Sequence, residues 1–159
     1  MGYRVDMNRF ENMIIVIDTR EQAPLPFTLP TERGTLATGD YSIKGLEDYI
    51  AIERKSIDDL VACLKNGNRE RFERELSRGR SLDYFALVLE CDLALLADHQ
   101  YQSLMNPKSV IQSVITFSVR YKLPVFFCEN RQYCARMVES LLQKYVREIE
   151  KKLNLLAVV

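Results

Sequence analysis

Continuous apolar runs are the feature of this sequence that most limits how the chain can fold. Residues 13–17 read Met-Ile-Ile-Val-Ile, with no polar side chain among them. Side chains alternate between the two faces of a strand, so a run of this kind predicts a strand that is buried on both faces. Residues 83–90 and 123–128 carry further apolar runs, which predict two more strands.

Helical patterns separate the later apolar runs, and a hairpin precedes them. The segment from Gly39 to Asp59 turns around residues 44–48 and returns as the apolar run 49–52. Residue spacing, turn residues and capping residues then predict a turn at residues 66–68 and helices over residues 56–64, 69–80, 93–97, 106–121 and 132–153. A hairpin followed by strand–helix alternation predicts an α/β protein of three layers, α/β/α, with a central mixed sheet.

Size and composition fit a single globular domain. The chain has 159 residues, of which 47% are hydrophobic and 28% are charged, which is enough for one hydrophobic core. The sequence contains no run of about 18 apolar residues, so a membrane span is not expected. We expect residues 13–153 to form the domain, residues 1–12 an N-terminal extension and residues 154–159 an apolar C-terminal tail.

The cysteines and the histidine do not indicate a metal site. The four cysteines contain no Cys-x-x-Cys pair, and with a single histidine in the chain structural zinc is not expected. Cys91 and Cys128 have apolar neighbours, which predicts buried, reduced thiols. Reduced thiols indicate a cytoplasmic location. His99 stands in a polar segment and is expected in a surface loop.

The hairpin carries the residues that point to chemistry. Asp40 opens it, and its returning strand ends on Glu53-Arg54-Lys55. Glu53 and Lys55 are two positions apart and share one face of the strand, while Arg54 points to the other face. Carboxylates gathered in this way can hold Mg²⁺ or Mn²⁺, because hard divalent cations prefer oxygen ligands. A bound metal of this kind polarises a phosphoryl oxygen and activates water, so the pattern predicts a metal-dependent phosphodiesterase.

Two further residues complete the predicted site. Lys55 lies beside carboxylates and stays charged, which suits electrostatic stabilisation of a phosphoryl transition state better than proton abstraction. Asp18 follows the first apolar run, where a strand end would place a third carboxylate near the other two.

The ordered set of motifs resembles the nuclease domain of the XPF family. That family pattern is Asp-x-Arg-Glu at a strand end, then Gly-Asp, then Glu-Arg-Lys and an Asp after three further residues. Here the elements are residues 18–21, residues 39–40 and residues 53–55 with Asp59, and none is substituted. The resemblance implies the restriction-endonuclease-like PD-(D/E)XK fold, and the order of later elements agrees with it to about residue 152.

The resemblance also implies a role for each motif residue. Four residues would be catalytic, and the first three of them would bind the metal: Asp18, Asp40, Glu53 and Lys55. Four neighbours would support the metal ligands or face the substrate: Arg20, Glu21, Arg54 and Asp59.

Other roles compete for the supporting residues. Arg20 and Glu21 could form a surface ion pair, which contributes about 0–1 kcal/mol. Ser56-Ile57-Asp58-Asp59 also fits a helix capping box, in which Asp59 is the third helical residue. Arg54 could bury its stem against a helix in place of touching substrate.

A basic segment follows the motif. Lys and Arg equal Asp and Glu at 22 each, so total charge gives no argument for nucleic acid, but the distribution does. Arg71, Arg74 and Arg78 recur at helical spacing and would share one face. This stripe would follow a DNA backbone, or else it is a solvated helix with Glu–Arg pairs. The predicted DNA-binding set is Arg69, Arg71, Arg74 and Arg78.

Together with the resemblance, these observations predict a metal-dependent DNA endonuclease of repair or recombination, selective for branched or flap DNA and located at the nucleoid of a prokaryote or in the nucleus of a eukaryote. One alternative is a non-catalytic DNA-binding or scaffolding subunit of a nuclease heterodimer, and another is an enzyme of the same fold that cuts RNA. Larger XPF relatives carry a helix-hairpin-helix module after the nuclease domain. No such signature follows residue 153, which puts selection of branched DNA in question.

The resemblance also implies a homodimer, or a heterodimer with a related subunit. The last predicted helix carries an apolar stripe that either packs in the core or forms this interface. Its members are Met137, Leu141, Leu142, Tyr145, Val146 and Ile149.

Overall fold

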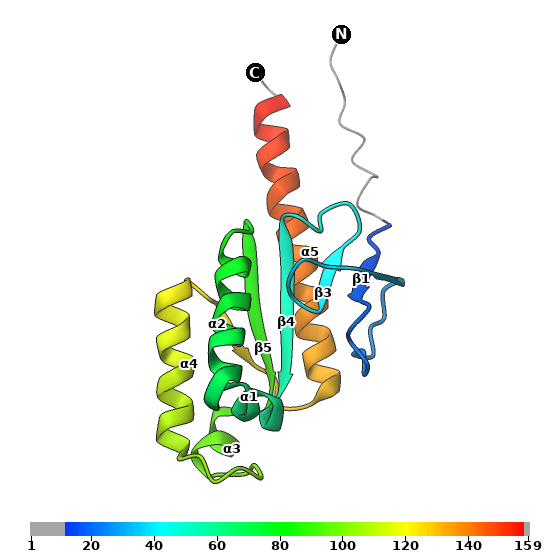
Figure 1. The fold of residues 1–159 in the computed structure, drawn as a ribbon. Coiled ribbons are helices and arrows are strands. Elements are labelled where there is room, and N and C mark those ends of the chain that lie inside the picture. Colours follow the sequence, from blue (N-terminus) through cyan, green and yellow to red (C-terminus); the bar gives the residue numbers. More distant parts are fainter. Residues whose placement is uncertain (1–11, 158–159) are drawn as a thin grey trace.

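The computed structural model describes residues 12–157, which build a single six-stranded sheet with helices on both faces (Figure 1). The strand order is β2-β1-β3-β4-β5-β6. The strands are β1 (Ile15–Asp18), β2 (Thr31–Gly34), β3 (Tyr41–Ile43), β4 (Ile50–Ser56), β5 (Tyr84–Glu90) and β6 (Val125–Phe127). Strand β3 runs antiparallel to both β1 and β4, whereas the other neighbours are parallel. The predicted mixed sheet is confirmed.

Five helices cover the two faces within the described residues. They are α1 (Ile57–Cys63), α2 (Asn66–Arg80), α3 (Leu93–Ala97), α4 (Pro107–Tyr121) and α5 (Arg131–Ala157). Figure 1 shows α1, α2 and α4 on one face of the sheet and α5 on the other. No helix in the described part of the chain is long and apolar enough to cross a membrane.

Alternate residues of the central strands feed two hydrophobic cores. Ile50 and Ile52 of β4 pack in the core under α5, whereas Ala51 between them packs in the core under α1, α2 and α4. Strand β5 divides in the same way, so both faces of the sheet are covered. Continuing the alternation along β4, Glu53 and Lys55 face α1 and α2, and Arg54 faces the side of α5.

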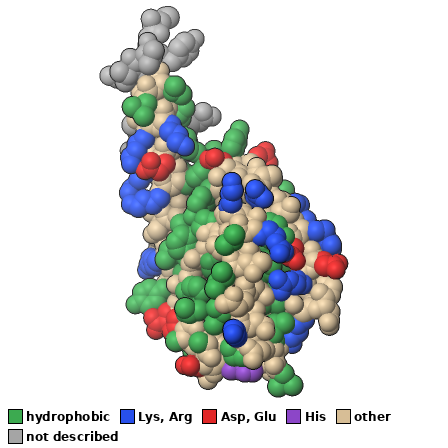
Figure 2. Space-filling view, turned by 90° about the vertical axis from the view of Figure 1, so that its left-hand side faces the viewer, with side chains coloured by type: hydrophobic (Ala, Val, Ile, Leu, Met, Phe, Trp, Pro, Cys, Tyr) green, Lys and Arg blue, Asp and Glu red, His purple; other side chains and the backbone are tan. Residues whose placement is uncertain are grey.

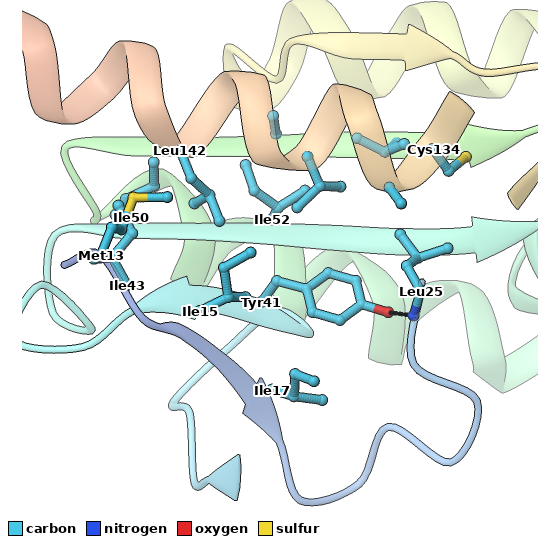
Figure 3. Close-up of a cluster of buried hydrophobic side chains, with 14 of the residues drawn as sticks. Met13, Ile15, Ile17, Leu25, Tyr41, Ile43, Ile50, Ile52, Cys134 and Leu142 are labelled. Atoms are coloured by element: carbon cyan, nitrogen blue, oxygen red, sulfur yellow. Dashed lines mark hydrogen bonds between the residues drawn. The ribbon is translucent and has the colours of Figure 1, made fainter. Parts of the chain in front are cut away.

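The core under α5 also anchors the loop that follows β1. Tyr41 of β3 is fully buried, and its hydroxyl accepts a hydrogen bond from the backbone amide of Leu25 at 3.1 Å (Figure 3). The same hydroxyl donates to Oε2 of Glu21 at 3.1 Å. The loop from Thr19 to Pro30 is thereby tied to the sheet, and Glu21 is held near the end of β4.

The apolar stripe of α5 belongs to this core. Leu142 is 0% exposed and Val146 is buried, and the intermediate residues Met137, Leu141 and Tyr145 pack against the same cluster. Of the two alternatives for the stripe, core packing is confirmed for these five residues, whereas Ile149 lies outside the cluster and the dimer stays a prediction. The five residues pack in the core because α5 is the layer that covers this face of the sheet.

Several predicted boundaries need correction. Residues 66–68 are not a turn but the first residues of α2, which begins at the positive-φ residue Asn66. Helix α5 runs to Ala157, so residues 154–157 of the predicted tail continue the helix. Of the predicted N-terminal extension only Asn12 is described, and residues 158–159 of the tail also lie outside the described part.

Two surface features complete the comparison with the predictions. Strand β2 was not predicted, because Thr-Glu-Arg-Gly carries no apolar run and lies at the exposed edge of the sheet. His99 is exposed and stacks on Tyr101, as expected for a surface loop. The thiols of Cys91 and Cys128 are free and buried, as predicted.

The face covered by α4 exposes apolar side chains. A groove of about 220 Å³ runs between α3, α4 and β6 and includes Ile111, Ile115 and Phe127. Figure 2 shows this side of the molecule, with hydrophobic side chains gathered over one part of it and Lys and Arg over another.

Candidate active site

A pocket of about 400 Å³ opens where β4 meets α1 and α2. Its lining is mostly polar and charged, which separates it from the apolar groove beside α4. The lining residues are Arg20, Glu21, Asp40, Glu53, Arg54, Lys55, Asp59, Ala62, Cys63, Asn68, Arg71, Phe72 and Glu75. We call this cavity the acidic pocket.

The β3–β4 pairing brings Asp40 beside the end of β4. The backbone amide of Asp40 donates to the carbonyl of Ile52 at 2.9 Å, and Oδ2 of Asp40 accepts a hydrogen bond from the amide of Arg54 at 2.8 Å. The preceding Gly39 has a φ of 81°, and a Cβ there would lie 2.9 Å from that of Ala51. Only glycine fits this bend without strain, so the Gly-Asp pair of the motif is a requirement of the backbone.

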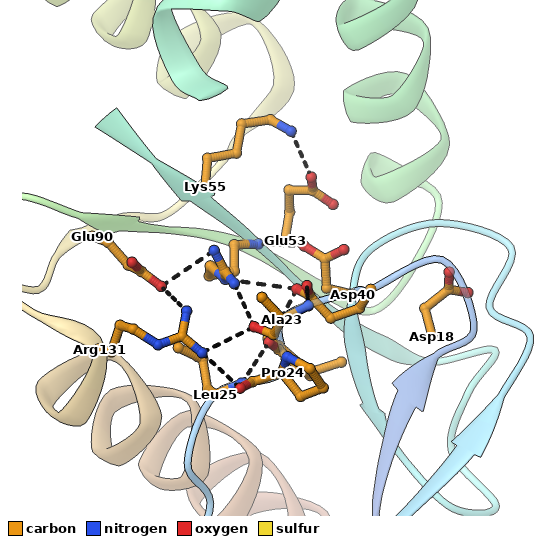
Figure 4. Close-up of polar contacts among 12 residues, drawn as sticks. Asp18, Ala23, Pro24, Leu25, Asp40, Glu53, Lys55, Glu90 and Arg131 are labelled. Atoms are coloured by element: carbon orange, nitrogen blue, oxygen red, sulfur yellow. Dashed lines mark hydrogen bonds and ion pairs between the residues drawn. The ribbon is translucent and has the colours of Figure 1, made fainter. Parts of the chain in front are cut away.

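Glu53 and Lys55 extend from the same face of β4, as predicted. The Nζ of Lys55 lies 2.8 Å from Oε1 of Glu53 (Figure 4). The side chain of Glu53 is 5% exposed and that of Lys55 is 15% exposed. Phe72 of α2 supports the lysine, whose Nζ lies 4.8 Å from the ring centroid.

The acidic pocket holds more negative charge than its cations balance. Burial, together with the charge of Glu21, raises the pKa of Asp40 to about 6. Burial and the neighbouring charge of Asp40 raise the pKa of Glu53 well above its usual value. Burial alone would lower the pKa of Lys55, but the charge of Glu53, the hydrogen bond to it and the charge of Glu75 together outweigh burial and raise that pKa, so the lysine stays protonated.

A divalent cation fits this arrangement. The Oε2 atom of Glu53 is buried and has no hydrogen-bond partner among the described residues, which is costly for a carboxylate oxygen unless a cation binds it. Asp40 lines the same pocket and repels Glu53. Oxygen ligands of this kind suit Mg²⁺ or Mn²⁺. Within residues 12–157, however, no three acidic, histidine or cysteine side chains already stand at the spacing of a complete metal site.

Asp18 is not brought to the acidic pocket. Its oxygens accept hydrogen bonds from the side chain and amide of Arg20 and from the amide of Leu36, and its side chain is 2% exposed. Burial raises the pKa of Asp18, but these hydrogen bonds outweigh it and lower that pKa. Figure 4 shows Asp18 at the end of β1; its backbone amide donates to the carbonyl of Asp40 at 2.8 Å, but its side chain does not line the acidic pocket. In this structure the carboxylate organises the loops after β1 and β2, so its predicted place among the metal ligands is not formed.

Arg54 faces the other side of the sheet and anchors the loop after β1. Its side chain is 8% exposed, lies 3.6 Å from Glu21 and 3.3 Å from Glu90, and donates to the carbonyl of Ala23 at 2.7 Å. Arg131 of α5 lies 3.4 Å from the same Glu90 and also binds the carbonyl of Ala23 (Figure 4). This network favours the alternative in which Arg54 is buried. The Arg20–Glu21 ion pair considered from the sequence is not formed, because Arg20 pairs with Asp18 and Glu21 lies beside Arg54.

Sequence comparison decides the family. A sequence model of the ERCC4 domain matches residues 17–141, which is most of the chain. This chain belongs to the ERCC4 domain family.

Solved structures share the fold of this ERCC4 domain. It superimposes on XPF from Aeropyrum pernix with a TM-score of 0.66 and 19% identity, over 83% of this chain and 61% of that chain. XPF from Aeropyrum pernix in complex with DNA gives a TM-score of 0.67 and 19% identity, over 85% of this chain and 66% of that chain. The chain thus spans less than two thirds of either XPF chain. The restriction-endonuclease-like fold is confirmed. A comparison with curated proteins finds no match.

In this ERCC4 domain Asp59 lies at the start of α1. Its backbone amide donates to Oγ of Ser56 at 3.1 Å, which confirms the predicted helix cap. Its exposed side chain also lines the acidic pocket. The cap leaves this side chain free to face the pocket, and its supporting role stays a prediction.

The predicted DNA-binding arginines of the ERCC4 domain divide between two surfaces. Arg71 lines the acidic pocket, and Arg74 and Arg78 are exposed on the same helix. Arg69 instead faces α4, where it donates to Oγ of Ser113 at 2.9 Å and its guanidinium lies 5.0 Å from the ring centroid of Phe117. Arg69 therefore packs two helices together and lies apart from the stripe of Arg71, Arg74 and Arg78.

Sequence reasoning missed one acid of this ERCC4 domain, Glu75. It lies on α2 and lines the acidic pocket opposite the β3–β4 hairpin. The buried residues of α2 are Phe72, Leu76 and Gly79, so Glu75 borders the face that packs on the sheet. Helical spacing from Phe72 could have revealed this position, since residues three apart share a face.

Proposed function

We propose that this chain is a metal-dependent DNA endonuclease that hydrolyses phosphodiester bonds. The observation that carries the proposal is the buried, unpartnered Oε2 of Glu53 beside Asp40 and Lys55 in one open pocket. Membership of the ERCC4 domain family supports it, as does similarity to an XPF that was solved in complex with DNA.

Asp40 and Glu53 would hold the cation, with Mg²⁺ and Mn²⁺ as the ions that suit their oxygens. The bound ion would supply Lewis-acid polarisation of the phosphate and an activated water. Lys55 would place a fixed positive charge at the phosphoryl oxygens as negative charge grows on them. Its pKa is raised, so it acts as a cation and not as a base.

Exposed arginines give the substrate an approach to the acidic pocket. Arg71 lies in the pocket lining, and Arg74 and Arg78 continue along α2. Within the described residues none of the three forms a salt bridge, so their charges remain available to backbone phosphates. Arg20 also lines the pocket, although its guanidinium is engaged by Asp18.

The proposal has further parts. The enzyme would select branched or flap DNA and act in repair or recombination, at the nucleoid or in the nucleus. It would also form a homodimer. The scaffolding alternative is weaker, because non-catalytic subunits of this kind lose motif acids and the motif here is intact. RNA remains a second substrate to test, since the phosphate chemistry is shared.

The test is cleavage of a labelled panel of single-stranded DNA, duplex, splayed fork, 3′ flap and matching RNA, in Mg²⁺, Mn²⁺ or EDTA. The proposal expects metal-dependent cutting that Asp40→Asn abolishes. Binding of DNA without cutting in either metal would support the scaffolding subunit instead. Preferred cutting of RNA would reassign the substrate.

A further inference from the structure

Glu75 reaches the acidic pocket from a different layer of the fold than the motif residues. Asp40, Glu53 and Lys55 come from the β3–β4 hairpin, whereas Glu75 comes from α2, which closes the pocket from the other side. The main chain of Glu75 is fixed to the segment before Asp40, because Oγ1 of Thr38 donates to the carbonyl of Glu75 at 3.3 Å.

Close packing of α2 on the sheet positions this residue. Gly79, four positions after Glu75, is buried against the ring of Phe85 on β5, and a Cβ at Gly79 would overlap that ring. Phe72, three positions before Glu75, lies under the ammonium group of Lys55. Glu75 is therefore held between two contacts that draw α2 onto the strands carrying the motif.

The ion pairs of the described residues leave three of the five pocket acids without a cation: Asp40, Asp59 and Glu75. Glu53 pairs with Lys55, and Glu21 lies beside Arg54. Within residues 12–157, neither Asp40 nor Glu75 has a salt-bridge partner. Asp59 is exposed at the start of α1, whereas Asp40 and Glu75 are half-buried, and the latter two carboxylates together carry the charge that one divalent cation neutralises. The unpartnered Oε2 of Glu53, buried in the same pocket, offers that cation a further oxygen.

We propose that Glu75 supplies the third carboxylate of the cation site, in the place that the motif pattern assigns to Asp18. This inference rests on the proposed function in one respect, that the acidic pocket binds a divalent cation. It does not depend on which substrate is cut. Glu75 would bind the ion directly or through one ordered water, from α2, while Asp18 stays engaged with Arg20 and Leu36.

The test measures Mn²⁺ binding to the DNA-free protein by calorimetry and by electron paramagnetic resonance. Glu75→Gln keeps the shape of the side chain and removes its charge, and we expect it to weaken Mn²⁺ binding by about tenfold or more. Glu70→Gln is the matched control, because Glu70 is exposed on the same helix and lies outside the pocket lining. It should bind Mn²⁺ like the wild type. Glu75→Ala serves as a second variant at the same position, and circular dichroism checks that each variant is folded.

Asp18→Asn separates the two assignments. We expect it to lower the melting temperature, because Asp18 holds two loops, while Mn²⁺ affinity of the folded protein stays near that of the wild type. Wild-type Mn²⁺ affinity in Glu75→Gln, together with a large loss in Asp18→Asn, would overturn the proposal. Absence of Mn²⁺ binding by the wild type would overturn it as well.

Failure of the proposed function gives a different pattern. Suppose that the wild type binds Mn²⁺ and Glu75→Gln does not, but no DNA or RNA is cut. The assignment of Glu75 as a cation ligand is then supported, and the proposed nuclease activity is wrong. If the wild type cuts DNA and Glu75→Gln has unchanged Mn²⁺ affinity, the nuclease stands and the ligand does not.

Discussion

The backbone amide of Arg54 donates a hydrogen bond to Oδ2 of Asp40 at 2.8 Å, so the strand that carries Glu53 also orients the second acid of the pocket. An asparagine at position 40 can accept the same bond through its Oδ1. We therefore expect Asp40→Asn to fold normally, to lose cleavage and to be more stable than the wild type in EDTA by about 1–2 kcal/mol, since it no longer repels Glu53. Denaturant unfolding measures the gain. Asp48→Asn in the exposed hairpin turn is the control, and an equal gain there would contradict the explanation.

The stability of the metal-free protein should depend on pH through the same acid. Burial raises the pKa of Asp40 from 3.8 to about 6, so the folded state holds this proton more tightly than the unfolded chain does. The resulting stabilisation is complete below about pH 4 and is lost as the pH rises past about 6. The advantage of Asp40→Asn over the wild type in EDTA should accordingly grow between pH 4 and pH 7. A constant advantage over that range would argue against repulsion between the acids.

Lys55 should contribute to rate more than to metal affinity. Its ammonium group pairs with Oε1 of Glu53, while Oε2 of that residue is the atom left without a partner. We expect Lys55→Ala to lower cleavage by about a hundredfold or more, with Mn²⁺ affinity changed far less. The variant should also be destabilised by about 1–3 kcal/mol, because Glu53 loses its buried partner. A collapse of Mn²⁺ affinity with an unaffected rate at saturating metal would assign Lys55 a structural role.

The exposed arginines of α2 should govern how DNA binding responds to salt. Changing Arg71 and Arg74 together to Gln should weaken DNA binding and reduce the slope of log affinity against log salt by about 1–2. Lys144 and Lys151 are exposed on α5, which covers the opposite face of the sheet, and changing both to Gln is the matched control. Fluorescence anisotropy across a salt series measures both slopes. Equal slopes for the wild type and the Arg71, Arg74 variant would indicate that α2 is a solvated helix that does not contact the DNA backbone.

Gly79 should be the residue on which the distance between α2 and the sheet depends. Gly79→Ala forces a methyl group into the ring of Phe85, so we expect a loss of about 1–3 kcal/mol in the free energy of unfolding. Gly67→Ala is the control, because open space surrounds Gly67 in the first turn of the same helix. That change should instead stabilise by up to about 1 kcal/mol through helix propensity. A neutral Gly79→Ala would show that α2 moves freely relative to the sheet.

The sequence predicted those parts of the fold that depend on local patterns. Apolar runs located β1, β5 and β6, and Asn106 and Pro107 located the start of α4, because burial and capping are recorded within a few neighbouring residues. Strand β2 escaped prediction because an edge strand at the surface needs no apolar run.

The candidate active site also has one part that local sequence patterns predict and another part that they do not. Asp40, Glu53 and Lys55 could be placed together from the alternation of one hairpin. The orientation of Asp18 could not, because it depends on the amide of Leu36, which β2 brings back from 18 positions away. Helical spacing from Phe72 gives the face of α2 on which Glu75 lies, but its approach to the hairpin depends on how closely α2 packs on β5, which sequence spacing does not give.

The concentration of motif residues in one hairpin has a consequence for how this domain can change over evolution. The chemistry requires a short stretch of chain whose internal hydrogen bonds already hold two acids and a lysine in order. Helix α2, which carries the arginines proposed to contact the substrate, lies outside that stretch. Descendants of such a domain can therefore alter what they recognise, one helix or loop at a time, while the reaction itself is inherited unchanged.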